Sequence, residues 1–147
     1  MALVIYNIAN KTDINWATAD IRVLLLGGTS VPAGCLDPDL TNVAAILAVS
    51  GAAELIATNY ARKTTTRTDT QDDVNNRANQ ALSVSVLWEN LGGTINGTIR
   101  GYLFYVYNAA DASAVPILAE SFAVGVLTDG TDVILPAQDV IRTAQGT

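Results

Sequence analysis

The chain has 147 residues and a formal net charge of −6; half of its residues are apolar and only 15% are charged. This length suits one domain, residues 1–147, around a single core. No apolar run reaches the roughly 18 residues of a membrane-spanning helix, so we expect no membrane partner. The acidic balance argues against a nucleic-acid partner, because binding to the phosphate backbone depends on clustered lysine and arginine.

The sequence contains no histidine and a single cysteine, Cys35. It therefore lacks a disulfide within the chain, the usual neutral-pH general base and every Ser-His or Cys-His pair. We expect no enzyme, no catalytic residue, no cofactor and no metal site. Carboxylate-only hydrolysis stays open as an alternative. The aspartates that would serve it are Asp37, Asp39, Asp69, Asp72 and Asp73.

The N-terminal third predicts two strands. The run Leu3–Ile8 is rich in β-branched and aromatic residues and ends at a polar break, which favours an edge strand. It lacks the basic start, long apolar segment and cleavage site of a secretory signal. The segment Ala19–Leu26 predicts a buried strand, because its second half is wholly apolar and a glycine pair follows it.

One helix is predicted, from Asp39 to Val49. Asp39 is a suitable N-cap, and Ser50-Gly51 is a suitable stop. Its apolar face comprises Leu40, Val43, Ala44 and Leu47. Beyond it we predict a brief strand at Ala53–Ala57.

The middle of the chain is polar. Lys63–Thr68 predicts an exposed strand, because it is rich in threonine and carries basic side chains that suit a core poorly. The stretch Asp69–Gln80 is too hydrophilic for core packing and predicts a loop.

Two aromatic-rich strands are predicted after this loop. Ala81–Trp88 alternates with a period of two and predicts a strand with one buried face. Both alternating sets of Ile99–Tyr107 are largely apolar, which predicts a central strand. A glycine-rich bend would join the two as a hairpin.

The C-terminal part predicts strands at Val115–Val126 and Asp132–Leu135, separated by a turn at Thr128–Thr131. We expect the remainder to fray or to dock on a neighbour. The fold class that follows is mainly β: an antiparallel β-sandwich or small barrel of about seven or eight strands with one short helix.

The acidic groups are better explained by turns than by ligand binding. Asp37-Pro38-Asp39 is a typical turn and helix cap. The stretch Asp69–Asn75 spaces its oxygen side chains like a calcium loop, but Val74 replaces the glycine and Gln80 the glutamate that an EF-hand needs. Asp129–Asp132 is also a typical turn, and either segment leaves only a loose cation site open.

Aromatic and basic residues offer two further surfaces. Trp16, Trp88 and the tyrosines favour core packing, with a stacking platform for sugars as the alternative. Arg62, Lys63 and Arg67 form a basic cluster for partner binding, which would contact an acidic protein neighbour; a solvated strand face is the alternative.

Several segments in this order resemble a family of small β-rich virion structural proteins of tailed bacteriophages. The resembling segments are Ala19–Leu26 with Val31-Pro32, Asp39–Val43, Glu54–Arg62, Val86–Trp88, Gly97–Asn108 and Pro116–Phe122. Together they span about four-fifths of the chain. The sequence departs from the family at Val43–Ala57 and at the bend Glu89–Asn96.

The resemblance implies a protein of the virion, on the capsid exterior, that decorates or cements the shell by binding the major capsid protein. It also implies a homo-oligomer, most simply a trimer, since each copy of a low-charge shell component can bury surface on its neighbours. Edge strands at Leu3–Ile8 and Lys63–Thr68 would suit such pairing. The alternative is a tail or fibre component that binds host surface carbohydrate.

Overall fold

The computed structural model describes residues 2–12, 14–15, 18–72, 77–82, 85–136 and 138–144. These residues form ten β-strands, two short α-helices and one 3-10 helix, and every strand pair is antiparallel. The predicted fold class is confirmed: the chain is mainly β and sandwich-like, and it does not close into a barrel. No helix in the described part of the chain is long and apolar enough to cross a membrane.

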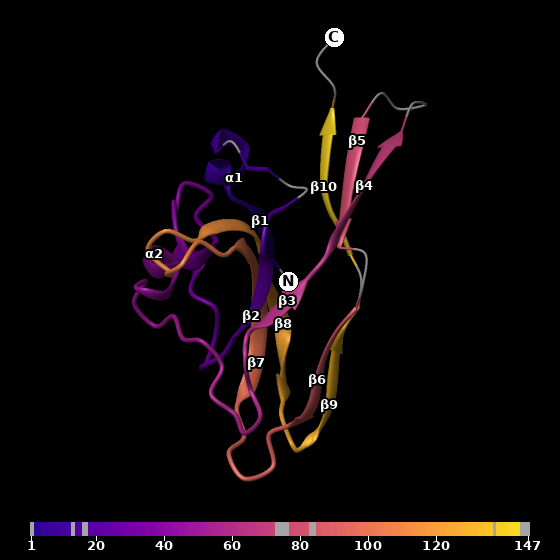
Figure 1. Ribbon diagram of the computed structural model, residues 1–147. Coiled ribbons are helices and arrows are strands. Elements are labelled where there is room, and N and C mark those ends of the chain that lie inside the picture. The colour runs from indigo at the N-terminus through magenta and orange to yellow at the C-terminus, as the bar shows by residue number, and fades with distance from the viewer. Residues whose placement is uncertain are drawn as a thin grey trace.

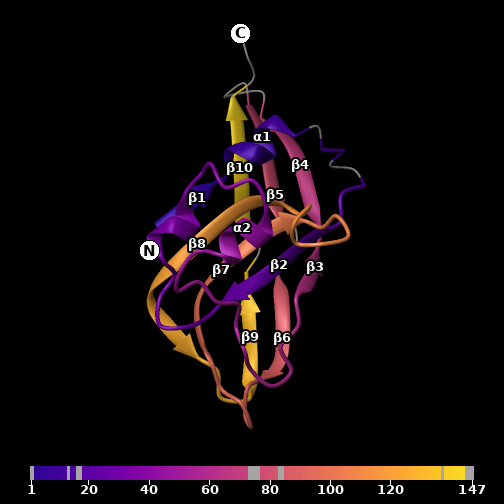
Figure 2. The ribbon, with the colours of Figure 1, turned by 90° about the vertical axis from the view of Figure 1, so that its left-hand side faces the viewer.

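A five-stranded sheet forms the first layer, in the order β1-β8-β7-β2-β3 (Figures 1 and 2). Its strands are β1 (Ala2–Ile5), β2 (Ile21–Leu26), β3 (Lys63–Thr65), β7 (Thr98–Val106) and β8 (Val115–Leu127). The predicted central strand is confirmed as β7, which pairs with β2 on one side and β8 on the other. The expected edge strands, β1 and β3, lie at the two edges.

A two-stranded ribbon, β6 (Val86–Leu91) and β9 (Thr131–Leu135), packs over part of this sheet as the second layer (Figure 1). The predicted hairpin between the two aromatic-rich strands is therefore wrong, because β6 pairs with β9 and not with β7. The reason lies in the glycine bend. Gly92 and Gly93 both have φ of 97°, which carries the chain from one layer to the other.

A three-stranded arm extends away from the two layers, in the order β10-β5-β4 (Figure 1). It consists of β4 (Arg67–Asp72), β5 (Arg77–Leu82) and β10 (Gln138–Ala144). The loop predicted over Asp69–Gln80 is wrong wherever residues are described. Residues 138–144 form β10 and do not fray, and docking of this end on a neighbour stays a prediction. Strands need backbone pairing, not buried side chains, so a hydrophilic stretch can form them once a partner strand lies alongside. The arm accounts for the strands beyond the predicted seven or eight.

The predicted strand Ala81–Trp88 is divided in the structure. Its first two residues end β5, and its last three begin β6. Residues 83 and 84 lie outside the described part of the chain.

The helical segments are shorter than the sequence predicts. Helix α2 covers Val43–Leu47, and its N-cap is Asn42, whose Oδ1 accepts the Ala45 N–H at 2.8 Å, so the predicted cap at Asp39 is wrong. Asp39 instead belongs to a turn, where its N–H donates to Asp37 Oδ1 at 3.0 Å.

Three smaller differences concern short segments. Helix α1 (Asn7–Lys11) takes Ile8 from the predicted first strand, and η1 (Ala33–Leu36) is a 3-10 helix. The brief strand predicted at Ala53–Ala57 reduces to one bridge between Glu54 and Leu26.

The five-stranded sheet buries apolar side chains on both faces. One cluster lies between the sheet and the β6–β9 ribbon and includes Trp88, Tyr102 and Phe104. The other lies beneath α1, α2, η1 and their loops and includes Leu103 and Tyr105. The β7 strand thus supplies both clusters, which explains why its sequence is apolar on both faces.

Candidate protein-docking surface

Five exposed aliphatic side chains belong to segments that lie at the end of the molecule opposite the arm (Figure 1), and we call them the apolar end. They are Ile56, Ile95, Val124, Val126 and Leu127. Val124 is 81% exposed and Leu127 66% exposed. Isolated exposed aliphatic residues are ordinary, but a gathering of them at one end is typical of an interaction site.

Backbone contacts bring these residues together from three segments. The Thr58 N–H donates to the carbonyl of Ile95 at 2.9 Å, which joins the loop before β3 to the β6–β7 connection. Thr98 pairs with Leu127 in the ladder of β7 and β8, and this brings the end of β8 to the same place. The apolar end is therefore a product of the fold, since its segments are far apart in sequence.

A groove of about 430 Å³ continues from the apolar end, between β8 and β9. It is lined by Leu25, Trp88, Ile99, Tyr102, Glu120, Phe122, Val126, Asp132, Val133, Ile134, Leu135 and Pro136. Val126 belongs to both surfaces and makes them continuous. A largely apolar cavity of this size is typical of ligand pockets and of interface pockets.

The groove exists because of two irregularities in the sandwich. The second layer has two strands against five in the first, so it does not cover the whole sheet. In addition, one residue of β7, Arg100, stands opposite the four residues 122–125 of β8, because the register shifts between Ile99 and Gly101. Such a bulge bends a strand away from its partner and opens space beside it.

The polar groups of the groove are acidic. Tyr102 donates its hydroxyl hydrogen to Glu120 Oε2 from within the groove. Asp132 Oδ1 accepts the Asn90 N–H at 2.8 Å. None of the described residues that line the groove is basic. Among the ion pairs between described residues, none involves Glu120 or Asp132.

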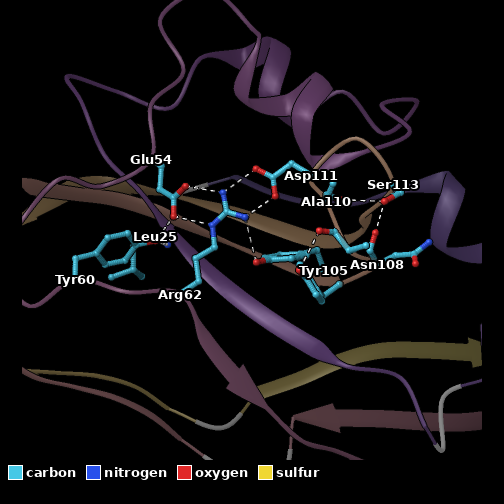
Figure 3. A network of polar contacts seen from close by, with 11 residues as sticks. Leu25, Glu54, Tyr60, Arg62, Tyr105, Asn108, Ala110, Asp111 and Ser113 are labelled. Atoms are coloured by element: carbon cyan, nitrogen blue, oxygen red, sulfur yellow. Dashed lines mark hydrogen bonds and ion pairs between the residues drawn. The ribbon is translucent and has the colours of Figure 1, made fainter.

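Arg62 lies in a different polar cluster, on the other face of the sheet (Figure 3). Its guanidinium pairs with Glu54 at 2.7 Å and with Asp111 at 2.5 Å, and it donates to the Tyr105 hydroxyl at 3.3 Å. Tyr60 extends the cluster, because its hydroxyl donates to Glu54 and accepts the Leu25 N–H. We call this group of residues the arginine clamp.

The clamp fastens two loops over the sheet. Glu54 lies in the loop before β3, and Asp111 lies in the turn between β7 and β8. The Asp111 carbonyl also accepts the Ala44 N–H at 3.1 Å, so the same turn holds the start of α2. Bidentate pairing of a guanidinium with two carboxylates fixes their relative positions, which makes this cover rigid.

The charges in the clamp stabilise one another. Hydrogen bonding to Glu54 and Asp111 raises the pKa of Arg62, and the same bond from Arg62 lowers the pKa of Asp111. Burial raises the pKa of the Tyr60 hydroxyl, to which Glu54 adds, so it stays protonated and can donate.

The basic cluster predicted for partner binding is spread over different surroundings. Arg62 directs its guanidinium toward carboxylates of its own chain. Lys63 is half-buried at the start of β3, and Arg67 begins β4, where its side chain lies outside the described structure. Binding of a partner by these residues stays a prediction.

The aromatic residues belong largely to the core, as the sequence favours. Trp88 is fully buried and donates its Nε1–H to the Ala61 carbonyl at 2.8 Å. Tyr6, Tyr102 and Tyr105 are buried as well. Trp16 lies outside the described residues.

Asp37, Asp39 and Asp129, which the sequence assigns to turns, lie in turns. Asp129 Oδ1 accepts hydrogen bonds from the Thr131 hydroxyl at 2.6 Å and from the Thr131 N–H at 3.0 Å, and these two bonds lower the pKa of Asp129. Within the described residues, no group of three or more His, Cys, Asp or Glu side chains is placed to hold a metal. The predictions for Asp69, Asp72 and Asp73 concern side chains outside that part of the chain.

Sequence reasoning missed both the apolar end and the groove. One signal was present: the five residues that follow Phe122, Ala-Val-Gly-Val-Leu, include no polar side chain. The strand predicted over Val115–Val126 is present as β8, and its residues 123–127 are largely exposed. The two acidic lining residues could not be found, since Glu120 and Asp132 come to line one groove only through the packing of the two layers.

Comparisons of the chain with models of protein families, with curated proteins and with solved structures found no match. The functional proposal therefore rests on the geometry described above together with the resemblance noted in the sequence.

Proposed function

We propose that the chain is a structural component of a tailed bacteriophage particle that decorates or cements the outside of the capsid. It binds the major capsid protein and assembles as a homo-oligomer. The observation that carries the proposal is the apolar end with its adjoining groove. The bacteriophage particle comes from the resemblance, and the docking surface comes from the geometry.

The exposed aliphatic groups favour a protein partner on energetic grounds. Removal of apolar surface from water stabilises an interface by about 25 cal/mol per Å², and Val124 and Leu127 leave most of their surface in water in the isolated chain. Open edges at β1 and β3 offer further backbone groups for pairing with neighbouring copies.

Particle labelling tests this proposal. An antibody against the recombinant protein should label the capsid shell of the phage that encodes it, as seen by immunogold electron microscopy. Labelling of tails alone would contradict the proposal, and so would unlabelled particles.

A rebinding experiment tests the surface itself. Particles prepared without the protein should bind wild-type protein, and Val124→Asp should reduce that binding at least tenfold. Leu87→Asp is the matched control, because Leu87 is an exposed aliphatic residue of β6, outside the apolar end and the groove lining. Equal loss of binding by both variants would show that the apolar end has no special role.

A tail or fibre component that binds host carbohydrate is the second candidate, and one hollow favours it. This hollow of about 370 Å³ has Tyr107, Asn15, Asp20 and Asn108 among its lining residues. Sugars bind to such combinations of an aromatic ring with amide and carboxylate groups. The Arg22 guanidinium lies 3.6 Å from the centre of the Tyr107 ring, however, and covers one face of it.

A glycan array separates the two candidates. Binding of a host glycan that is lost in Asn108→Ala would support the carbohydrate function. An array without any signal would remove it and leave the docking function unaffected.

A further inference from the structure

We infer that the groove between β8 and β9 receives an arginine or lysine side chain from the protein on which this chain docks. The inference rests on the proposed function for the existence of a protein partner, and it adds the chemistry by which that partner is recognised. It is drawn from the shape of the groove, its charges and the free strand edge beside it.

The walls of the groove suit a long aliphatic stem. Its floor and sides include Leu25, Trp88, Ile99 and Phe122, and its volume of about 430 Å³ has room for a large side chain. Arginine and lysine bury three or four methylene groups along apolar surface while the charged head reaches a polar site. A short polar side chain would leave these walls without contact.

The acidic groups of the groove favour a positive charge at the end of the entering side chain. Glu120 and Asp132 both line it, and no basic side chain does among the described residues. Glu120 is half-buried, so its carboxylate has lost part of its water. A cation from outside would pair with this carboxylate in a medium less polar than water, where the attraction is stronger than at an exposed site. The same field would repel an acidic side chain.

The backbone beside the groove suits an extended partner segment. Strand β9 pairs with β6 alone, so its other edge carries no partner strand among the described residues. A segment added along such an edge directs every second side chain toward the same face. One of those side chains would enter the groove while its neighbours contact the apolar end.

Three basic side chains of the described structure are engaged elsewhere. Arg22 pairs with Asp20 at 2.7 Å, and Arg100 donates to the Gly28 carbonyl at 3.4 Å. The Arg62 guanidinium is held by Glu54 and Asp111 on the opposite face of the sheet. Lys63 belongs to β3, at the sheet edge farther from β8. A second copy is therefore an outcome to be tested, and a different protein is the partner that we infer.

The test is a peptide titration of the intact chain. We would synthesise a nine-residue peptide of alternating valine and threonine with a central arginine. The control peptide carries citrulline, which has the shape of arginine without its charge. Binding is followed by NMR through the indole N–H signal of Trp88, which lines the groove. We expect the arginine peptide to bind at least tenfold more tightly than the citrulline peptide, and added salt to reduce that ratio.

Variants locate the site. Glu120→Gln preserves the size of the side chain and an oxygen for the Tyr102 hydroxyl, and it should remove most of the preference for arginine. Glu89→Gln is the matched control, since Glu89 is an exposed residue of β6 outside the groove lining. Equal affinity for both peptides would overturn the inference, and so would an unchanged preference in Glu120→Gln.

Two further outcomes would also overturn it. Octylguanidinium that binds as tightly as the arginine peptide would make the groove a site for a free organic cation. Self-association by light scattering that Glu120→Gln abolishes would place a second copy there. The proposed function fails separately: particles that never bind the chain would refute capsid docking even if the arginine peptide enters the groove.

Discussion

Tyr102 and Tyr105 lie on opposite faces of β7, and their hydroxyls meet different surroundings. The Tyr105 hydroxyl accepts a hydrogen bond from Arg62 in a cluster where two carboxylates share one guanidinium. The Tyr102 hydroxyl donates to Glu120 in a groove lined by acids and apolar residues. One face has its charges paired within the chain, whereas the other has acidic groups without an ion pair among the described residues.

This difference between the two faces indicates that one face of the sheet stabilises the fold, whereas the other is available for recognition of a partner. The clamped face covers its apolar cluster with short helices and loops that ion pairs hold in place. The grooved face is covered by only two strands, so its cover is incomplete. Apolar surface that the fold leaves uncovered can stabilise a complex when a partner buries it.

Loss of Trp88 should have the largest effect, because this residue joins the two layers of the grooved face. We expect Trp88→Ala to lower the free energy of unfolding by about 3–5 kcal/mol, as for other large buried aromatic residues. Urea denaturation followed by circular dichroism would measure it. A loss below about 1 kcal/mol would mean that the β6–β9 ribbon contributes little to the fold.

The second-largest loss of stability is expected when the arginine of the clamp is removed. Arg62→Met leaves Glu54 and Asp111 near each other without their cation, and both are partly buried. We expect a cost of about 2–3 kcal/mol, below the range for fully buried pairs because water screens part of the charge. Arg100→Met is the control, since Arg100 makes no ion pair among the described residues; an equal loss there would contradict a special role for the clamp.

The clamp also predicts a dependence on pH. Arg62 lowers the pKa of Asp111 in the folded chain, so the unfolded chain binds more protons near that pKa. The stabilisation is therefore complete above the unfolded pKa of about 4 and is lost as the pH falls through the lower folded pKa.

Asp111→Asn should accordingly cost about 1 kcal/mol at pH 7, after allowance for the exposure of the pair, and less at pH 3. Thermal unfolding of both proteins across this pH range would measure the gap. A gap that grows toward acid would have the wrong sign for this mechanism.

The next change is smaller and opposite in sign: a substitution at Thr65, on the grooved face, should increase stability. Its hydroxyl is buried without a hydrogen-bond partner in the described structure, and Thr65 pairs with the core residue Ile21 across β3 and β2. Thr65→Val retains the shape and removes the unsatisfied group, so we expect about 0.5–1 kcal/mol of stabilisation in urea denaturation. Destabilisation would indicate that the hydroxyl is hydrated or bonded in solution.

The smallest change in stability is expected at the apolar end. Val124→Ser should alter the free energy of unfolding by less than about 0.5 kcal/mol, because an exposed side chain makes few contacts. Its effect should appear instead in rebinding to particles. A large loss of stability would show that Val124 belongs to the core, and the apolar end would then lose one of its members.

The strands of the core could be predicted because hydrophobic periodicity is a local signal. It identified β2, β7, β8 and β9 with small errors at their ends. It failed for the arm, where the residues of β4 and β5 are polar and backbone pairing alone defines the strands. It also placed a helix cap at Asp39, because the sequence does not indicate which of two nearby cap residues, Asp39 or Asn42, meets the helix start.

The candidate site was less accessible to prediction. Its acidic residues come from β8 and β9, which pair with different strands and belong to different layers. The bulge that opens the groove depends on the register of β7 against β8. Neither the pairing of strands nor their register can be predicted from the composition of a single strand.

The sequence by itself determined that this protein is a β-rich domain with an aromatic core and a central strand buried on both faces, because side-chain hydrophobicity acts residue by residue. The tertiary structure alone decided that β6 pairs with β9 and not with β7, that Arg62 joins two loops, and that an acidic groove adjoins an apolar end. Those features arise where segments distant in the chain come together, and only the packing of the two layers sets which segments meet.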